Sequence, residues 1–254
     1  MYQEERMEAI LQYLKQHQRM SIQEMCRQFS ISRDTARRDT VKLAEQGMVV
    51  RTHGGVMLSA VKETLKGYGE RLERASLEKQ NIALEAVSRI KQGETVMLDA
   101  STTVQFTAEQ ITTVPLTVIT NSLENAERLP HQMETDIYLL GGRLHPEHRF
   151  LYGPGTLEKL AGYYADRAFI GVIGVSEDGF YHAHEEDAAV KRKMADRAGK
   201  VYVLADHTKF YKKHFYRGMG LAEADAVITD VPPPPEMQKV LQEHGVELII
   251  AGQH

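Results

Sequence analysis

Basic side chains gather in one short stretch of the chain, residues 30–55, and their types suit contact with nucleic acid. Four of them share a predicted helix from Arg33 to about Gln46: Arg33, Arg37, Arg38 and Lys42. Arginine can donate two hydrogen bonds to one guanine, and both kinds of cation can contact phosphate. The alternative is a solvated charged helix on which Asp34 and Asp39 pair locally with the arginines.

The elements around this helix indicate a winged helix-turn-helix, which would present the helix to double-stranded DNA. A first helix is predicted from about Gln3 to His17, and a second follows Ser21, a preferred N-cap residue. Short strands at 48–50 and 56–58 flank a basic hairpin. The N-terminal part of a recognition helix usually reaches base edges, which favours Ser32, Arg33 and Thr35 there, whereas Arg38 suits phosphate and the wing suits backbone or minor groove. The predicted DNA contacts are Ser32, Arg33, Thr35, Arg37, Arg38 and Lys42 from the helix and Arg51, His53 and Gly54 from the wing.

Small polar residues end three predicted strands later in the chain. Asp99-Ala100-Ser101-Thr102-Thr103 follows an apolar strand, Thr120-Asn121-Ser122 follows the next, and Gly141-Gly142 ends the third. Hydroxyl groups and free backbone N–H groups at a helix N-terminus form an anion site. Ligands of open α/β sheets bind at the carboxyl ends of the strands. The sequence therefore favours a phosphate site here, although each polar residue alone would read as an ordinary helix cap.

Alternation of apolar strands and helices from Leu77 onward predicts an α/β domain with a largely parallel, buried sheet. Strands are expected at 93–99, 116–120, 136–142, 166–175, 200–206, 225–230 and 246–251. Helices are expected at 77–91, 102–112, 122–129, 156–164, 187–198 and 235–244. The predicted organisation is a DNA-binding domain over 1–58, a linker over 59–76 and an effector-binding domain over 77–254.

Overall composition restricts the class of protein. The 254 residues carry a net charge of −4, but residues 1–58 hold nine basic and seven acidic side chains, so the basic character is local to the predicted DNA-binding domain. No apolar run approaches the ~18 residues of a membrane span, and no signal-peptide pattern opens the chain. The single cysteine, Cys26, excludes an intrachain disulfide. We expect a cytoplasmic protein.

The basic stretch resembles the signature of the DeoR-type bacterial transcriptional regulators. The resemblance rests on residue identity and spacing at Thr35, Arg37, Arg38, Asp39, Leu43, Gly47, Arg51, His53, Gly54 and Gly55. Two positions depart from the family pattern, because Ala36 stands for its usual Ile or Val and Thr40 for its Leu. Both belong to the inner face of the predicted helix, which we therefore expect to be underpacked by about 1–3 kcal/mol.

The later motifs resemble the effector domain of the same family, at 99–103, 120–122, 141–142, 169–174 and 206–210. The resemblance implies a ribose-phosphate-isomerase-like domain that senses a phosphorylated sugar, with no cofactor. It further implies phosphate contacts at Ser101, Thr102, Thr103 and Asn121, and contacts to hydroxyls or phosphate at Asp206 and Lys209. The family's Glu-to-Lys motif appears as Asp187–Lys191, with a carboxylate about one methylene shorter. The complete predicted effector set is Asp99, Ser101, Thr102, Thr103, Asn121, Ser122, Gly141, Gly142, Lys191, Asp206 and Lys209.

Two other classes of function compete with a sensor. A sugar-phosphate isomerase-like enzyme would need a carboxylate base, but the corresponding strand end, Gly171-Val172-Ile173-Gly174-Val175-Ser176, has no acid before Glu177. A metal site could use His182 and His184, or His145 and His148, although such polar clusters are usually solvated. We expect neither catalysis nor a bound metal.

These observations predict a DNA-binding transcriptional regulator, and a repressor of a sugar-utilisation operon in particular. Its operator binding would be controlled by a phosphorylated sugar. A small winged domain makes few base contacts, so we expect a homodimer or homotetramer on repeated half-sites.

Overall fold

The computed structural model describes residues 3–17, 19–45, 48–52, 55–58, 68–73, 76–113, 115–129 and 134–252. The chain forms two compact units, Met1–Leu65 and Lys66–His254. Within the described ranges, no helix is long and apolar enough to cross a membrane.

The first unit is a helix-turn-helix with a small antiparallel sheet. Its elements are α1 (Gln3–His17), β1 (Arg19–Ser21), α2 (Ile22–Phe29), α3 (Arg33–Glu45), β2 (Val49–Thr52) and β3 (Gly55–Leu58), and the strand order is β1-β3-β2. The predicted cap at Ser21 is confirmed, since its hydroxyl accepts from Glu24 N at 3.1 Å and the Glu24 carboxylate accepts from Ser21 N. Ser30 ends α2 in the left-handed conformation, with φ 52°, and so turns the chain towards α3.

A buried ion pair ties α3 to α1. Asp39 is completely buried, and its carboxylate accepts from Arg6 Nε at 2.6 Å and from Gln3 Nε2 at 2.9 Å. The alternative in which Asp39 pairs locally with the arginines of its own helix is therefore wrong. Ala36, Thr40 and Leu43 are buried as the inner face of α3, and the Thr40 hydroxyl donates to Arg37 O at 2.8 Å.

The second unit begins with α4 (Tyr68–Glu73), which lies inside the segment that the sequence indicates as a linker. Tyr68 is 7% exposed, and its hydroxyl donates to Gln105 Oε1. The surrounding sequence is charged and contains glycine, so it does not indicate that Tyr68 is buried. Burial of this tyrosine stabilises a helix that is too short to be stable alone.

Seven parallel strands form the central sheet of the second unit, in the order β15-β14-β12-β9-β4-β5-β6. Their bounds are β4 (Thr95–Leu98), β5 (Leu116–Thr120), β6 (Thr135–Leu139), β9 (Ala165–Gly171), β12 (Ala198–Leu204), β14 (Ala226–Thr229) and β15 (Glu247–Ile250). The helices are α5 (Ser76–Ser88), α6 (Thr102–Gln110), α7 (Leu123–Arg128), α8 (Pro154–Ala161), α9 (Glu185–Asp196) and α10 (Pro235–Glu243).

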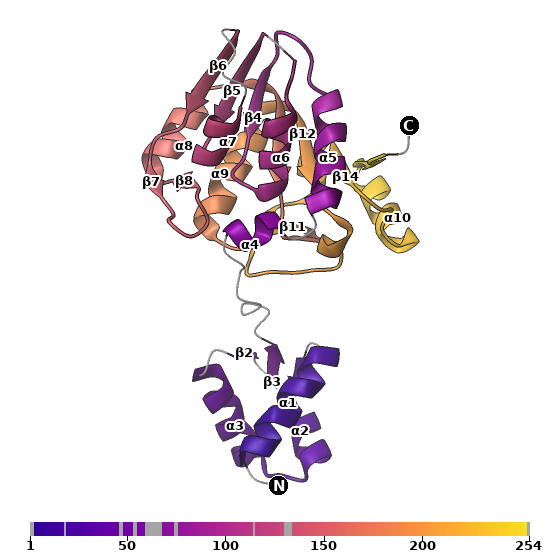
Figure 1. Cartoon of the computed structure of the whole chain (residues 1–254). Helices are drawn as coiled ribbons and strands as arrows, with labels where there is room; N and C mark the ends of the chain where they lie inside the picture. Colours follow the sequence, from indigo (N-terminus) through magenta and orange to yellow (C-terminus); the bar gives the residue numbers. More distant parts are fainter. Residues whose placement is uncertain are drawn as a thin grey trace. The chain divides into compact units, whose positions relative to one another are not determined.

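Helices cover both faces of this sheet, as Figure 1 shows. Alternate strand residues point to opposite faces. Val96 and Leu98 pack in one apolar cluster with residues of α5 and α6, whereas Met97 packs in another with residues of α8, α9 and α10. The predicted α/β domain with a buried parallel sheet is thus confirmed.

Smaller strands complete the unit. β7 (Arg143–Leu144) pairs with β8 (Leu151–Tyr152), and β10 (Gly174–Ser176), β11 (Gly179–His182) and β13 (Tyr216–Met219) form a second antiparallel sheet. The single strand expected over 166–175 is therefore wrong. β9 ends at Gly171, and β10 pairs with β11 instead. Two short 3-10 turns, η2 (His207–Lys209) and η3 (Leu221–Glu223), follow β12 and β13.

Candidate DNA-binding surface and effector site

The first turn of α3 is organised by Ser32. Its hydroxyl accepts from Thr35 N at 3.1 Å and is hydrogen-bonded to the Thr35 hydroxyl at 2.9 Å, and its carbonyl accepts from Ala36 N. This cap leaves Ser32 and Arg33 exposed and Thr35 half-buried. The residues predicted to read base edges therefore lie at the accessible end of the helix.

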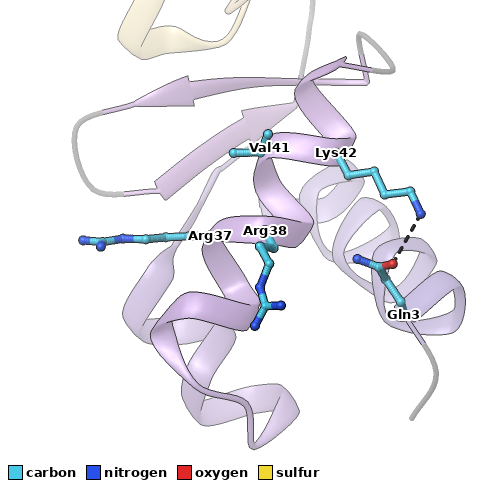
Figure 2. Close-up of a pocket in the computed structure, with 5 residues that line it drawn as sticks. All are labelled: Gln3, Arg37, Arg38, Val41 and Lys42. Carbon is cyan, nitrogen blue, oxygen red and sulfur yellow. Dashed lines mark hydrogen bonds between the residues drawn. The ribbon is translucent and has the colours of Figure 1, made fainter.

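The remaining cations of α3 point in different directions, as Figure 2 shows. Arg37 and Arg38 are exposed, and Arg38 Nε donates to Asp34 O at 3.4 Å. Within the described ranges, neither Arg33 nor Arg37 has a carboxylate partner. Lys42 reaches towards α1 and donates to Gln3 Oε1 at 3.3 Å. An open hollow of about 440 Å³ lies at this surface, and it is lined by Gln3, Arg37, Arg38, Val41 and Lys42.

The predicted wing contacts are only partly described. The backbone of Arg51 lies in β2 opposite Val56, while His53 and Gly54 lie outside the described residues. Gly55 has a structural role that the DNA-contact pattern does not reveal. A Cβ on Gly55 would lie 2.2 Å from Met20 O, so only glycine lets β3 approach β1 closely.

The predicted effector residues begin at the centre of the parallel sheet. β4 lies between β9 and β5, and the chain order of the strands reverses there, which is the topological position where open α/β sheets bind ligands. Asp99 directly follows β4 and is fully buried. Its two carboxylate oxygens accept from Ser101 N and from Gly171 N, each at 2.9 Å.

Lys191 joins Asp99 and Asp187 in one buried cluster. Its Nζ lies 2.8 Å from Asp187 Oδ2, 2.9 Å from Gly171 O and 3.1 Å from Asp99 Oδ2. Burial alone would lower the pKa of Lys191, but the two carboxylates raise it, so the amine stays charged. The structure therefore brings Asp99 and Lys191 together, and all three ammonium hydrogens are used within the protein.

The serine-threonine loop forms the N-terminus of α6. Ser101 is its N-cap, and the hydroxyl accepts from Val104 N at 3.3 Å. Thr102 and Thr103 follow as the first helical residues, and both are buried. A ligand at this position would meet the free N–H groups of the first turn as well as the side chains.

The next strand end is connected to the first by Asn125, which the sequence did not single out. Asn125 Nδ2 donates to Asp99 O at 2.7 Å, and Asn125 N donates to the hydroxyl of Ser122, the N-cap of α7. Asn121 Nδ2 donates to Leu151 O at 3.1 Å. The role of Asn125 is identified only by its hydrogen bonds in the folded structure, because an asparagine within a helix does not by itself indicate a function in the sequence.

The two glycines after β6 have a different environment from the strand ends at β4 and β5. Both are exposed, and Gly141 O accepts from the Thr156 hydroxyl at 2.6 Å. Gly142 has φ 135°, and a Cβ there would lie 2.1 Å from Thr156 Oγ1. Gly142 is thus required for the approach of α8, whereas a Cβ on Gly141 would meet nothing within 4 Å. The predicted contact of both glycines with an effector stays a prediction.

Asp206 and Lys209 lie beyond β12, the neighbour of β9. Asp206 is buried and caps η2 by accepting from Thr208 N at 2.9 Å, while Lys209 Nζ lies 3.6 Å away from it. Burial would raise the pKa of Asp206, but Lys209, Thr208 and Lys79 hold it below its ordinary value. This carboxylate is therefore ionised at neutral pH, as the predicted contact with sugar hydroxyls requires.

Three histidines gather beside this edge. The ring centroids of His145, His148 and His184 lie 4.7 to 4.9 Å apart, and Phe150 stacks on His145 at 5.0 Å. Burial lowers the pKa of His148 to about 4 and, in the neighbouring β11, that of His182 to about 3. Among the residues described, no set of three His, Cys, Asp or Glu side chains is arranged to hold a metal ion.

Several buried polar atoms around this edge lack a hydrogen-bond partner within the part of the chain that the structure describes. They are Arg71 Nε, Asn121 Oδ1, Asn125 Oδ1, both ring nitrogens of His182 and Nε2 of His184. Buried polar groups are nearly always hydrogen-bonded in folded proteins, either to protein or to ordered water, so these atoms mark where the described residues leave hydrogen-bonding capacity open.

Comparison with known proteins matches both units to one family. A DeoR-like helix-turn-helix domain matches residues 6–61, and a DeoR C terminal sensor domain matches residues 74–231. Among solved structures, a ribose 5-phosphate isomerase of Methanocaldococcus jannaschii aligns with a TM-score of 0.38 and 20% identity, over 53% of this chain and 54% of that one.

Curated relatives align over nearly the full length. The HTH-type transcriptional repressor GlcR of Bacillus subtilis (strain 168) is 49% identical over 253 residues, which cover 100% of this chain and 98% of the relative. The glycerol-3-phosphate regulon repressor of Escherichia coli (strain K12) is 30% identical, over 98% and 99% of the two chains. The L-fucose operon activator of Haemophilus influenzae is 28% identical, over 96% and 98%. The chain therefore belongs to the DeoR family of transcriptional regulators.

Proposed function

We propose that this regulator represses a carbohydrate-utilisation operon and that a phosphorylated sugar or polyol releases it from the operator. Support for repression comes from two relatives, which are named as a repressor and as a repressor of the glycerol-3-phosphate regulon. The observation that carries the choice of ligand is a cluster of buried polar atoms beside the capped N-terminus of α6 for which the described residues supply no hydrogen-bond partner. The phosphate oxygens of a sugar phosphate can accept hydrogen bonds from the donors of this cluster, and its hydroxyl groups can donate to the acceptors.

Control of DNA binding requires an effector that distinguishes two arrangements of the protein. An effector that binds both arrangements equally shifts nothing, however tightly it binds. In this proposal the DNA-binding units act in pairs within a homodimer or homotetramer in the cytoplasm, and the effector favours an arrangement that does not fit paired half-sites.

The loop after β9 supports the proposal of binding without turnover. An aldose–ketose isomerase needs a carboxylate near C1 and C2 of the sugar, and residues Gly171 to Gly174 offer none. Glu177 is exposed, and its carboxylate accepts from the Ser176 hydroxyl at 2.6 Å. Asp99 and Asp187 are paired with Lys191, which disfavours either of them as a base. We propose a sensor that uses no cofactor.

The test of this proposal is operator release by phosphorylated ligands. An operator is first selected from genomic fragments with the full chain, and fluorescence anisotropy then follows the complex against hexose 6-phosphates, pentose 5-phosphates and glycerol 3-phosphate. We expect one phosphorylated compound to lower operator affinity at least tenfold, while its unphosphorylated counterpart has no effect. If none of the phosphorylated compounds changes operator affinity or thermal stability, the proposal fails.

The enzymatic alternative is tested separately. The protein is incubated with ribose 5-phosphate, and formation of the ketose is followed over time. Steady turnover would overturn the proposal that the second unit binds without catalysis.

A further inference from the structure

We propose that Arg71 of α4 binds the anionic group of the effector and that α4 is the element that responds to it. The inference rests on the proposed function, because it names the residue that would hold the phosphate. Arg71 lies in a segment that the sequence indicates as a linker, outside every motif that predicts an effector contact.

The side chain of Arg71 is prepared for a partner that the described residues do not supply. Its Nε is buried without a hydrogen-bond partner. The guanidinium carbon lies 5.7 Å from the centre of the Tyr68 ring, so the aromatic face fixes the direction of the charged group. A guanidinium presents several donors in a fixed fork that matches phosphate, and it keeps its charge at any physiological pH.

The hydrogen bonds of Tyr68 to Gln105 in α6 and to Glu147 O place α4, and with it Arg71, at the carboxyl edge of the sheet. The charge of Arg71 helps to lower the pKa of Asp187 and contributes to the lowered pKa of His148 and of His184. Burial lowers the pKa of Arg71, and the carboxylates of Asp187, Asp99 and Glu147 oppose that shift. These residues come from the loops after β4, β7 and β11 and from the first turn of α9, so Arg71 faces the same cluster as the predicted effector residues.

Arg71 can supply the cation for the effector that Lys191 cannot supply. The sequence predicts Lys191 as a cation for the effector, but its ammonium hydrogens point to Asp99, Asp187 and Gly171 O. Breaking these contacts would deprive the buried carboxylate of Asp99 and the half-buried carboxylate of Asp187 of their Lys191 partner. His182, with a pKa of about 3, is neutral. Among the described residues of this cluster, Arg71 is therefore a half-buried cation whose buried Nε keeps a donor available.

The contacts of α4 connect this residue to the site and to the chain that precedes it. Tyr68 N donates to Glu147 O at 3.3 Å, the Tyr68 hydroxyl donates to Gln105 in α6, and Lys79 donates to Arg71 O. The helix is thus held by α5, α6 and the loop between β7 and β8. It is also the first element of the second unit in chain order, so a ligand that pulls on Arg71 acts on the segment that leads to the DNA-binding unit.

The test compares Arg71→Gln and Arg71→Lys with the control Arg128→Gln, which removes an exposed arginine of α7 from the same unit. Calorimetry measures binding of the phosphorylated compound that releases the wild-type protein from its operator, with inorganic phosphate as a second probe. We expect Arg71→Gln to weaken binding 10- to 100-fold and Arg71→Lys to weaken it less. Operator affinity without ligand should stay within about twofold of wild type, which shows that the variant is folded.

Hydrogen exchange gives an independent measurement. In the wild-type protein the ligand should slow exchange of the amides of residues 68–73, and in Arg71→Gln at saturating ligand this protection should be lost. Unchanged ligand affinity in Arg71→Gln would overturn the role of Arg71 while the proposed function stands. A wild-type protein that binds no phosphorylated compound would overturn both.

Discussion

Gly171 lies where β9 ends, and its lack of a side chain allows the Asp99 loop to close. A Cβ at this position would lie 2.0 Å from Ser101 Oγ and 2.4 Å from Ser101 Cβ. The same residue donates its N–H to Asp99 and offers its carbonyl to Lys191. One glycine thus joins the two strand ends that meet at the reversal of strand order.

The first prediction concerns this glycine. Gly171→Ala should lower the free energy of unfolding by about 1–3 kcal/mol, because the added methyl must displace Ser101 and the loop it caps. Urea unfolding of the full chain measures the change. Gly155→Ala is the matched control, since a Cβ on exposed Gly155 meets nothing within 4 Å. Equal stability of the two variants would contradict the assigned packing.

The second prediction concerns the buried histidines, which should lower the free energy of unfolding at mildly acidic pH. The pKa of His182 is about 3 and that of His148 about 4 in the folded protein, below the ordinary value of 6.5. At pH values between the folded-state pKa and 6.5, the unfolded chain binds more protons than the folded chain does. The free energy of unfolding therefore decreases as pH falls below about 6.5. Each such histidine contributes up to about 1.4 kcal/mol per pH unit.

The measurement is urea unfolding at pH 7.5, 6.5 and 5.5. His148→Gln should reduce the dependence on pH, because it removes one of the buried rings. Equal stability at pH 7.5 and 5.5 would show that these rings are accessible to protons.

At the scale of elements, α3 is held by contacts that are far apart in sequence. Thirty-three positions separate Arg6 from Asp39, and no local pattern indicates that they pair. Removing the charge of Asp39 takes away the buried carboxylate that accepts from Arg6 Nε at 2.6 Å and from Arg6 Nη2 at 3.2 Å. Asp39→Asn should therefore destabilise the first unit by about 3–5 kcal/mol.

Hydrogen exchange of α3 and operator affinity report this loss, and we expect α5 and α6 of the second unit to keep their protection. Asp34→Asn serves as the control because Asp34 is an exposed residue of the same helix. If Asp39→Asn exchanges as slowly as Asp34→Asn does, the buried ion pair does not hold α3.

Elements with a clear periodicity could be predicted from the sequence, and those fixed by tertiary contacts could not. Strand β5 and helix α1 occur where their apolar spacing indicates. In contrast, every residue of β11 is buried, so its sequence shows no alternation of exposed and buried positions. Helix α4 has only six residues and depends on the burial of Tyr68.

The candidate site shows the same division. The caps at Ser101 and Ser122 could be predicted, because serine before a helix has a local physical reason to be there. The roles of Asn125, Gly171 and Arg71 depend on partners from other strands and helices. The ion pairs of Lys191 with Asp99 and Asp187 likewise depend on the folded structure.

At the scale of the whole molecule, the regulator combines a DNA-binding unit with a sensor unit of a single family. Arg37 is exposed on α3 and has no carboxylate partner in the described part of the chain. If it contacts a base, Arg37→Ala should weaken operator binding by about 1–3 kcal/mol and relax specificity at one base pair.

Anisotropy measurements with the selected operator and with single-base variants check this expectation at fixed salt concentration. Arg128→Ala removes an arginine from the sensor unit and should bind the operator as the wild type does. Uniform weakening across all base variants would instead assign Arg37 to phosphate contact.

Helix α4 has a practical consequence for the construction of hybrid biosensors. A sensor unit cut at residue 76 and fused to a foreign DNA-binding domain would lack Tyr68 and Arg71, and Gln105 would lose the hydroxyl it accepts from. A junction between Leu65 and Lys66 keeps these contacts. Chimeras joined there should retain their response to the inducer, and those joined ten residues later should not.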